Sequence, residues 1–319
     1  MAPSRWRRWA ALCLLAFSAQ AASARDLFVV CQDEATLVRF DTERAEVSAR
    51  VGLPPKPAMI AAAKRGELLF ITHPELGQIS RIETSRLEAP RSLNVGGTPF
   101  GIAASADGRF LYVGDWKANV VRKLDADTGA RLAEAPVGCE PAGLALDTRE
   151  ERLYVANRES RSVTILELPS MRRVGDIEVG EGPFALAFDG HNNRLVVAAV
   201  RSGEVTAIDA ATQAVTAQVA LGGAPYGVAI DGESDRVLVT NQHADRVTIV
   251  DKAGLSLIGT ITVGRYPEAV AAWRGKAYVA NWFSGDISIV DLATGESMAT
   301  VKIGEGPRSM AFADPGEAQ

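Results

Sequence analysis

Cysteine and histidine are scarce in this chain, and each accounts for only 3 of its 319 residues. So few cysteines exclude a small scaffold held together by disulfides. The sequence also lacks a CxxCH haem motif, a Gly-Lys-Ser/Thr phosphate loop, a GxSxG nucleophile elbow and an HExxH zinc motif. The core must therefore form by hydrophobic burial, which a chain of this length achieves without covalent cross-links.

Long hydrophobic runs are also rare. The longest lies near the N-terminus, roughly over Trp9–Phe17, behind a short basic region and ahead of small residues at 22–24. This layout predicts a cleavable secretory signal peptide over residues 1–24, because the run is too short to span a bilayer as a mature helix. We expect one mature domain over residues 25–319, located in a bacterial periplasm, with secretion as the alternative.

The predicted mature chain is acidic. Removing the three arginines of the signal peptide leaves 31 basic against 39 acidic residues, a net charge of −8. An acidic protein is a poor candidate for broad binding to nucleic acid or to an anionic membrane surface. No later segment is long and apolar enough to be transmembrane.

Two markers recur along the sequence with a nearly constant spacing. In both sets five successive spacings are 42 residues and the last is 40. A fixed period in this range predicts a propeller, a solenoid or an array. The first marker, which ends each segment like "YVAN", stands at Cys31, His73, Asp115, Asn157, Ala199, Asn241 and Asn281. The second is a proline, found at Pro57, Pro99, Pro141, Pro183, Pro225, Pro267 and Pro307.

Within one period the local signals indicate β-structure. Short runs such as "LYVAN" and "VTILEL" are rich in β-branched and aromatic residues. The Asp-x-x-Thr-Gly segments at Asp125–Gly129 and Asp291–Gly295 are typical of hairpin turns. We count four short strands per period and no helical periodicity. Seven such units predict an all-β fold, a seven-bladed β-propeller of four-stranded blades.

The two ends of the repeat array are out of phase. The mature chain begins with "DLFVV", which corresponds to a second strand, and finishes after "GPRSMAFA", which corresponds to a first strand. We therefore predict that the C-terminal strand joins the N-terminal blade and closes the ring, which leaves no unpaired inner edge.

The repeats resemble a known family. The segments "LYVAN", "VLVTN" and "AYVAN", each followed by a "VTIVD"-like strand and a "VGxxPxxxA" element, are similar to the YVTN family of β-propeller repeats. The resemblance covers roughly residues 27–313. It implies a propeller like those of bacterial periplasmic proteins and archaeal surface-layer proteins. Similar propellers occur in amine dehydrogenase heavy chains and in lactonases, so the fold alone does not choose an activity.

A binding face is predicted where the loop entering the first strand and the loop between the second and third strands surround the channel mouth. Residues in these loops vary between periods while the scaffold stays constant, which is typical of a binding surface. Aromatic residues there suit an interface anchor, although they can instead plug the channel. The predicted binding residues are Trp116, Trp282, Phe283, Phe100, Phe184, Tyr226, Tyr266, Arg158, Arg201, Glu268 and Arg308.

A metal site is a second expectation for this face. Cys31, His73 and Asp115 occupy equivalent positions in three consecutive periods, which are neighbours in a propeller. Thiolate, imidazole and carboxylate together suit zinc or copper. The alternative is that Cys31 is a small buried hydrophobic residue and that His73 replaces asparagine as a loop cap.

Oxygen ligands for calcium are a third expectation. Hard cations prefer several oxygen ligands. The resemblance to propeller repeats also implies this possibility, because similar propellers that hydrolyse lactones use such a cation at the channel mouth. In the alternative interpretation each asparagine caps its own turn. The oxygen-bearing candidates are Asn157, Asn241, Asn281, Asp115, Glu140, Glu181 and Glu268.

Three functions remain open from the sequence. The first is an exported, non-catalytic binding scaffold that engages a protein, a peptide or a small ligand at the channel mouth. The second is a cation-dependent lactone hydrolase, or an accessory subunit of a periplasmic quinoprotein or metal pathway. The third is a structural component of the envelope or surface layer.

Overall fold

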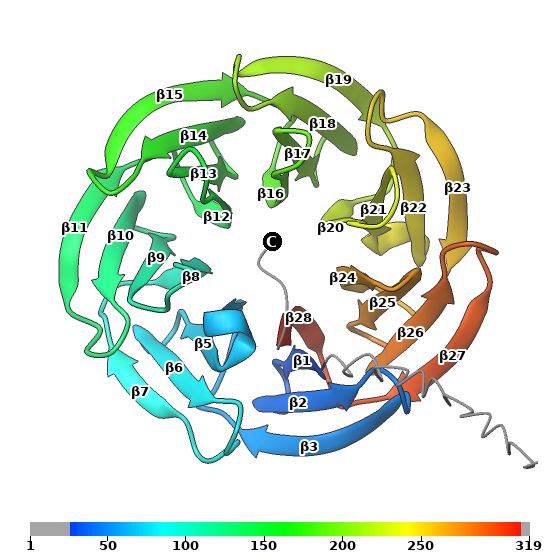
Figure 1. Cartoon of the computed structure of the whole chain (residues 1–319), viewed down its shortest axis with the longest axis horizontal. Helices are drawn as coiled ribbons and strands as arrows, with labels where there is room; N and C mark the ends of the chain where they lie inside the picture. The colour runs from blue at the N-terminus through cyan, green and yellow to red at the C-terminus, as the bar shows by residue number, and fades with distance from the viewer. Residues whose placement is uncertain (1–25, 314–319) are drawn as a thin grey trace, which may run out of the picture.

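The computed structural model describes residues 26–313, and it is an all-β ring (Figure 1). The strands form seven four-stranded antiparallel sheets, and each sheet is one blade with its first strand nearest the central axis. Two short 3₁₀ turns, η1 (Lys64–Gly66) and η2 (Gln242–Ala244), interrupt the β-structure. The seven-bladed propeller predicted from the 42-residue period is confirmed.

The first four blades follow the repeat in order. Blade 1 contains β28 (Pro307–Ala313), β1 (Asp26–Cys31), β2 (Thr36–Asp41) and β3 (Glu46–Gly52). Blade 2 contains β4 (Ile60–Ala63), β5 (Leu68–His73), β6 (Gln78–Glu83) and β7 (Arg91–Asn94). Blade 3 contains β8 (Pro99–Ala104), β9 (Phe110–Asp115), β10 (Val120–Asp125) and β11 (Arg131–Pro136). Blade 4 contains β12 (Pro141–Asp147), β13 (Arg152–Asn157), β14 (Ser162–Glu167) and β15 (Arg172–Glu178).

The last three blades complete the circle. Blade 5 contains β16 (Pro183–Asp189), β17 (Arg194–Ala199), β18 (Glu204–Asp209) and β19 (Ala214–Ala220). Blade 6 contains β20 (Pro225–Ile230), β21 (Arg236–Asn241), β22 (Arg246–Asp251) and β23 (Leu257–Thr262). Blade 7 contains β24 (Pro267–Trp273), β25 (Lys276–Asn281), β26 (Asp286–Asp291) and β27 (Ser297–Lys302).

The ring is closed by strand pairing between its two ends. β28 pairs antiparallel with β1, with Asp26 opposite Ala313 and Val29 opposite Met310. Blade 1 is therefore built from both ends of the described chain, as predicted from the phase of the repeat. Such closure removes two strand edges that would otherwise be open for pairing with another chain.

The core lies between neighbouring blades. In the second strand of a blade every residue after the first is buried, and in β5 the first is buried too, because both faces of the sheet pack against another blade. The fourth strand alternates between exposed and less exposed residues, as in β3, because one of its faces meets solvent. One interblade cluster joins Leu27 and Val29 of blade 1 to Tyr278 and Ile287 of blade 7.

Turn chemistry fixes the hairpins. The carboxylate of Asp125 accepts hydrogen bonds from the amides of Asp127 and Thr128, at 3.1 and 2.7 Å. Gly129 then takes a φ of +75°, which a residue with a side chain rarely adopts. Asp291 forms the same turn with the amides of Ala293 and Thr294. The hairpins predicted from Asp-x-x-Thr-Gly are present at both places.

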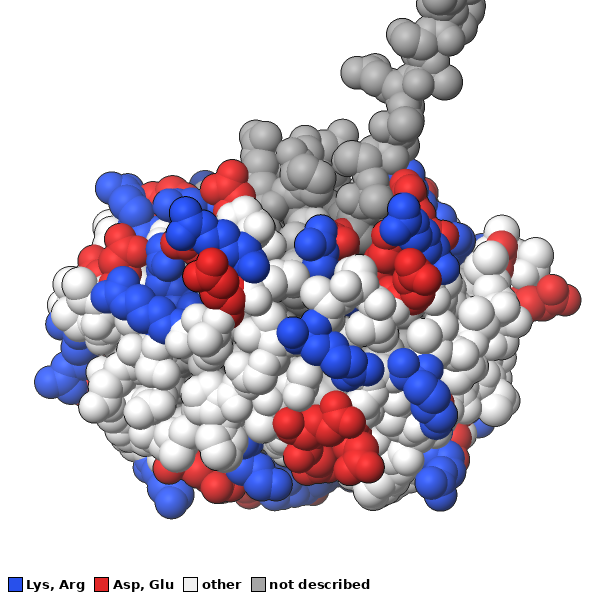
Figure 2. Space-filling view, turned by 90° about the horizontal axis from the view of Figure 1, so that it is seen from below, with Lys and Arg blue, Asp and Glu red and all other residues white. Residues whose placement is uncertain are grey.

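The outer surface carries charges of both signs. Figure 2 shows basic and acidic side chains beside one another on this side of the ring, with uncharged surface between them. Ion pairs at the surface include Arg44 with Glu46 and Arg50 with Glu34. Within residues 26–313 no helix is long and apolar enough to cross a membrane.

Candidate functional site at the channel mouth

One repeat position supplies the side chains that fill the channel mouth. This position directly follows the proline near the start of each first strand. It holds alanine in blades 2 and 4, and the missing bulk there leaves room for large side chains from other blades. We call the five large side chains the plug, and its members are Phe100, Phe184, Tyr226, Glu268 and Arg308.

Aromatic rings form one side of the plug. Phe184 lies against Tyr226, with ring centroids 4.2 Å apart, and Phe100 meets Phe184 edge to face at 5.9 Å. Phe100 also contacts Trp116 of the rim at 4.6 Å. Phe100 and Phe184 belong to blades 3 and 5, so their contact crosses the position where blade 4 has an alanine. The alternative reading of these rings as channel-filling residues therefore agrees with the structure.

Arg308 links the aromatic and the polar parts of the plug. Its guanidinium donates hydrogen bonds to the Tyr226 hydroxyl at 3.2 Å and to the side-chain oxygen of Gln32 at 3.1 Å. It also lies 5.5 Å from the centre of the Phe100 ring and 5.6 Å from that of Trp282. Arginine suits this place because its flat guanidinium can stack on aromatic rings and donate several hydrogen bonds at once.

Glu268 is the second charged member of the plug. The residue is only 6% exposed, and Gln242 donates a hydrogen bond to its Oε1 atom at 3.1 Å. Its Oε2 atom lies 3.7 Å from Nε of Arg308, and neither atom has a hydrogen-bond partner among the described residues. Burial raises the pKa of the Glu268 carboxyl to about 7, and the nearby guanidinium only partly opposes this effect.

A small cavity lies along the channel beside the plug. Its volume is about 210 Å³, and the first strands of the blades line it with small and aliphatic residues such as Ile60, Gly143 and Val270. Phe184, Tyr226, Glu268 and Arg308 also line it. Glu268 and Arg308 thus border this cavity, while the unpartnered Oε2 and Nε atoms themselves have almost no surface accessible to solvent.

The rim around the plug carries the other predicted binding residues. Trp116 lies under the guanidinium of Arg158 at 5.7 Å, and Arg158 pairs with Glu140 at 3.1 Å. Arg201 is held by Glu159 in a two-pronged ion pair. In blade 7 and the loop before it, Tyr266 packs against Phe283 with centroids 4.7 Å apart. Phe283 is 61% exposed, which makes it the most prominent aromatic side chain of this rim.

The three predicted metal ligands do not form a metal centre. The Cys31 thiol is buried and lies 3.7 Å from the carbonyl of Ile303, and burial raises its pKa to about 12. Both ring nitrogens of His73 are engaged, with Ser80 Oγ at 2.8 Å and Pro55 O at 3.2 Å. No three Cys, His, Asp or Glu side chains within residues 26–313 are grouped so that they could hold a metal ion.

Asp115, the third of these residues, has a structural task instead. It accepts backbone hydrogen bonds from Lys117 and Ala118 and forms an ion pair with Arg122 at 2.8 Å. The pattern recurs between the end of the second strand and the third strand of other blades. Asn157 donates to Thr164 at 2.8 Å, and Asn281 donates to Ser288 at 2.9 Å. We call this repeated side-chain contact the interstrand clasp.

The asparagines also hold the loop that enters the same blade. Asn157 accepts a hydrogen bond from the amide of Gly138 at 3.1 Å, and Asn241 accepts one from the amide of Ala224 at 2.9 Å. We expected each to cap its own turn, whereas they bridge to a loop about twenty residues earlier in the chain. Glu140 and Glu181 are engaged by Arg158 and Arg161 at 3.1 Å. Most of the oxygen-bearing candidates thus have protein partners, whereas Asn281 Oδ1 and Glu268 Oε2 accept no hydrogen bond from the described residues.

Sequence reasoning missed the two glutamines that support the plug. Gln242, which is 3% exposed, holds Glu268, whereas Gln32 connects Arg308 to the carbonyl of Pro57 at 2.7 Å. Both glutamines directly follow the marker residue in their blades. The available signal was that both glutamines stand at the same repeat position, on the face that also holds Glu268 and Arg308. Side-chain amides there can bond to an acid and to a base.

The fold and the filled channel define the class of this chain, which is a seven-bladed β-propeller. No protein-family model matches the chain, and no curated protein matches it in sequence. Solved structures give the relationship at the level of the fold. Hydrazine synthase from Kuenenia stuttgartiensis superposes with a TM-score of 0.75 at 20% identity, over 83% of this chain and 92% of that chain.

Two further structures are similar. A functionally unknown protein from Desulfotomaculum acetoxidans has a TM-score of 0.77 at 15% identity and covers 91% of this chain and 99% of its own. Dihydro-heme d1 dehydrogenase NirN, solved in complex with DHE, has a TM-score of 0.70 at 16% identity, over 90% of this chain and 74% of that chain. At these identities the similarity establishes the fold alone.

Proposed function

We propose that this protein is an exported binding scaffold of the YVTN type, which docks a protein or peptide on the aromatic rim of the channel mouth. The proposal includes export by the N-terminal segment, whose features lie outside the described residues. The in-register "YVAN" and "VGxxP" motifs support the family assignment. The acidic composition disfavours nucleic acid as the partner.

The observation that carries this proposal is the contrast between the plug and the rim. The plug side chains fill the mouth and are largely satisfied by one another, whereas the Phe283 ring is 61% exposed beside Tyr266 and Trp282. Exposed aromatic side chains with charged neighbours are typical of protein interfaces. A flat rim over a filled channel fits an extended partner better than a small ligand that needs a deep pocket.

Peptide display on the folded protein tests the rim directly. Peptides selected against the wild type should lose at least about tenfold in affinity for the Trp116→Ala/Phe283→Ala variant, because aromatic anchors carry much of the energy of an interface. The melting temperature should change little at Phe283, because substitutions at exposed sites usually have small effects. Trp116 is half-buried against Phe100, so the Phe283→Ala variant is also measured alone. The affinity is measured by titration calorimetry with synthetic peptides.

The matched control removes equally exposed apolar side chains elsewhere. Leu257 and Ile258 on β23 are 62% and 51% exposed and lie on the outer strand of blade 6. The Leu257→Ala/Ile258→Ala variant should bind the selected peptides like the wild type. Normal binding by the rim variant, or loss of binding in this control, would contradict the assignment of the rim as the docking surface.

A catalytic function is the second candidate, and Glu268 is the observation that favours it. A buried carboxyl with a pKa of about 7 and a free oxygen beside a cavity has the properties of a general acid or base. Two of the similar structures are named for enzymes, although their similarity extends only to the fold. A lactone panel, assayed with and without chelator, tests the hydrolase version. If the wild type hydrolysed a lactone and the Glu268→Gln variant did not, the hydrolase function would replace the scaffold proposal.

A further inference from the structure

A position on the third strand distinguishes blade 3 from all other blades. In blades 4, 6 and 7 it holds isoleucine, and in blade 5 alanine. In blades 1 and 2 it holds arginines that are both ion-paired, Arg39 with Asp26 and Arg81 with Glu83 and Asp127. In blade 3 it holds Lys123. The equivalent residues in order are Arg39, Arg81, Lys123, Ile165, Ala207, Ile249 and Ile289.

Lys123 is buried without the ion pair that its counterparts have. The residue is only 8% exposed, and it is packed in the interface that faces blade 4. No residue among 26–313 forms an ion pair or a side-chain hydrogen bond with its ammonium group, whose contact is the Phe110 ring at 4.2 Å. The Lys123 Nζ atom is not among the fully buried atoms that lack a hydrogen-bond partner, so the ammonium group keeps some contact with the hollow that it lines, where an anion can reach it. Its counterparts in blades 1 and 2 are instead occupied by carboxylates of the protein.

The Lys123 side chain lines a hollow between blades 3 and 4. Its volume is about 360 Å³, which is in the range of sites for small molecules. The rings of Phe110 and Tyr112 and the side chains of Leu146, Leu168 and Pro169 provide apolar walls. The hollow lies at the ends of β9 and β12, on the opposite side of the blades from the plug.

The other charged groups around the hollow limit which ligands can enter. Asp107 is neutralised by Arg109, whose Nε lies 2.6 Å from its Oδ2. Asp147 accepts the amides of Arg149 and Glu150 and so caps its own turn, while Glu151 lies exposed at the entrance. The lining thus sets Lys123 and Arg109 against the carboxylates of Asp107, buried Asp147 and Glu151, and this surplus of acidic groups favours a ligand with a single negative charge over a multiply charged anion.

We propose that this hollow binds a small monocarboxylate with an apolar body. The carboxylate would form a charge-assisted hydrogen bond with the Lys123 ammonium, and the apolar body would pack against Phe110, Leu146 and Leu168. Ligand binding would supply the counter-charge that Arg39 and Arg81 obtain from acidic residues of the protein. This site is independent of the docking surface proposed for the rim.

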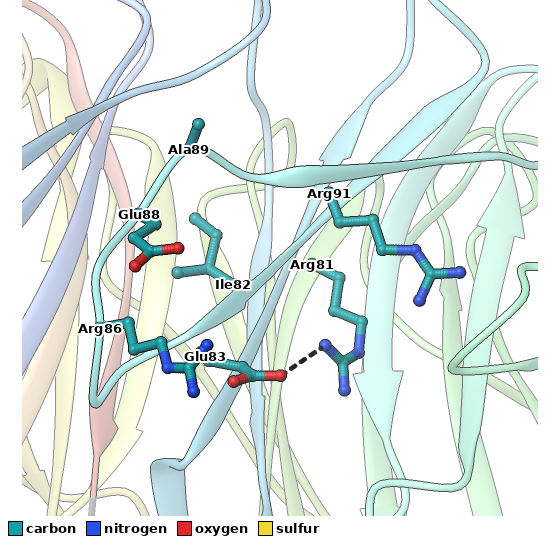
Figure 3. A pocket seen from close by; sticks show the side chains of 7 residues that line it. All are labelled: Arg81, Ile82, Glu83, Arg86, Glu88, Ala89 and Arg91. Carbon is teal, nitrogen blue, oxygen red and sulfur yellow. Dashed lines mark hydrogen bonds and ion pairs between the residues drawn. The ribbon is translucent and has the colours of Figure 1, made fainter.

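The counterpart of Lys123 in blade 2 lines a different hollow, formed by β6, β7 and the loop between them. Figure 3 shows this hollow, in which Arg81 points to Glu83, the distance between NH1 and Oε1 being 3.2 Å. Arg86, Glu88 and Arg91 surround the pair, so this hollow is lined by charges of both signs and contains little apolar wall. Blade 2 therefore has an ion-paired arginine at the position where blade 3 has a lysine without an ion pair.

Titration calorimetry with three probes tests the proposal on the wild-type protein. 3-Phenylpropionate has both the charge and the apolar body, 3-phenylpropanamide lacks the charge, and acetate lacks the body. We expect measurable binding of the first probe and at least tenfold weaker binding of the other two, because a hydrogen bond to a charged group contributes at least a factor of ten. Citrate, as a polyanion, should bind no better than acetate.

Two variants locate the site and separate binding from folding. Lys123→Met retains the aliphatic stem and should lose at least tenfold in affinity for 3-phenylpropionate, while its melting temperature without ligand equals or exceeds that of the wild type. Arg81→Met is the matched control in blade 2 and should bind the probe normally. Equal affinity of Lys123→Met and wild type, or a markedly lower melting temperature of Lys123→Met without ligand, would overturn the proposal. Failure of peptide binding at the rim would leave this result unaffected.

Discussion

Glu268 is the residue whose environment differs most from that of an exposed carboxyl group. It is buried in the plug, and Arg308 approaches it only to 3.7 Å, so the attraction between them does not fully compensate the loss of water. The folded protein therefore holds the Glu268 proton more tightly than the unfolded chain does. This difference makes the stability of the fold depend on pH near neutrality.

The stability should fall as the pH rises from about 4.5 to 7. In this window the unfolded chain has lost the Glu268 proton whereas the folded protein, in which the pKa is about 7, retains it. The folded state thus gains stability at low pH, and the gain disappears above pH 7. A pKa shift of this size corresponds to about 3 kcal/mol. Chemical unfolding at a series of pH values measures it.

The Glu268→Gln variant isolates this contribution. Glutamine keeps the shape and the contact with Gln242 but does not titrate. The difference in unfolding free energy between wild type and variant should change across pH 4.5–7 and stay constant above it. A difference that does not vary with pH would show that Glu268 titrates normally.

Individual residues also show where the sequence was ambiguous. The position of Cys31, His73 and Asp115 on one face was predictable from the repeat, but their partners were not. Each group is satisfied by a residue within its own blade or an adjoining loop, such as Ser80 for His73 and Arg122 for Asp115. Spacing along the sequence gives the face on which a side chain lies and not the atom to which it bonds.

In blades 2, 3, 4 and 7 the interstrand clasp joins the second strand to the third. In blade 5 the marker residue is Ala199, and in blade 6 Asn241 donates to the carbonyl of Gly222 instead. In both blades the threonine of the third strand, Thr206 or Thr248, has a buried hydroxyl without a partner among the described residues, which shows what a missing clasp leaves behind. The same contact in blade 4 also holds the amide of Gly138, so it connects two strands and a loop.

Asn157→Ala should destabilise the protein by about 1–3 kcal/mol. The substitution leaves the Gly138 amide without its acceptor and removes the hydrogen bond that Thr164 accepts, although the Thr164 hydroxyl still donates to Asp176. A polar group left without a hydrogen bond costs free energy of this order. Denaturant unfolding measures the change. Asn94→Ala on the outer strand β7, where the side chain is exposed, is the control and should change the stability by less than about 0.5 kcal/mol. Equal effects of the two variants would contradict a structural role for the clasp.

Strands were the best-predicted elements. The count of four strands per period was correct, and the apolar runs identified the inner strands, because these strands pack between two neighbouring blades in every repeat. The plug was only partly predicted. Phe100, Phe184 and Tyr226 were placed at the mouth, but their mutual contacts depend on the alanines of blades 2 and 4, whose effect appears only when the ring is assembled.

The whole ring depends on the pairing of β28 with β1. Met310 and Phe312 of β28 pack against the cluster between blades 1 and 7, so this strand both pairs with β1 and covers apolar surface. A chain ending at Gly306 should lose this strand and unfold at a much lower temperature, or fail to fold cooperatively. Circular dichroism during heating measures the transition.

A chain ending at Ala313 is the control for this truncation. It keeps β28 and should melt like the full-length protein. If the chain ending at Gly306 had the same melting temperature as this control, ring closure would contribute nothing to stability.

The plug draws Arg308 from β28 and Gln32 from the residue after β1, the two strands that close the ring. The channel mouth is therefore assembled only when β28 has paired with β1. A product without this pairing lacks both the closing strand and the arginine of the plug in its place. The propeller thus couples the formation of its proposed docking face to the closure of its ring.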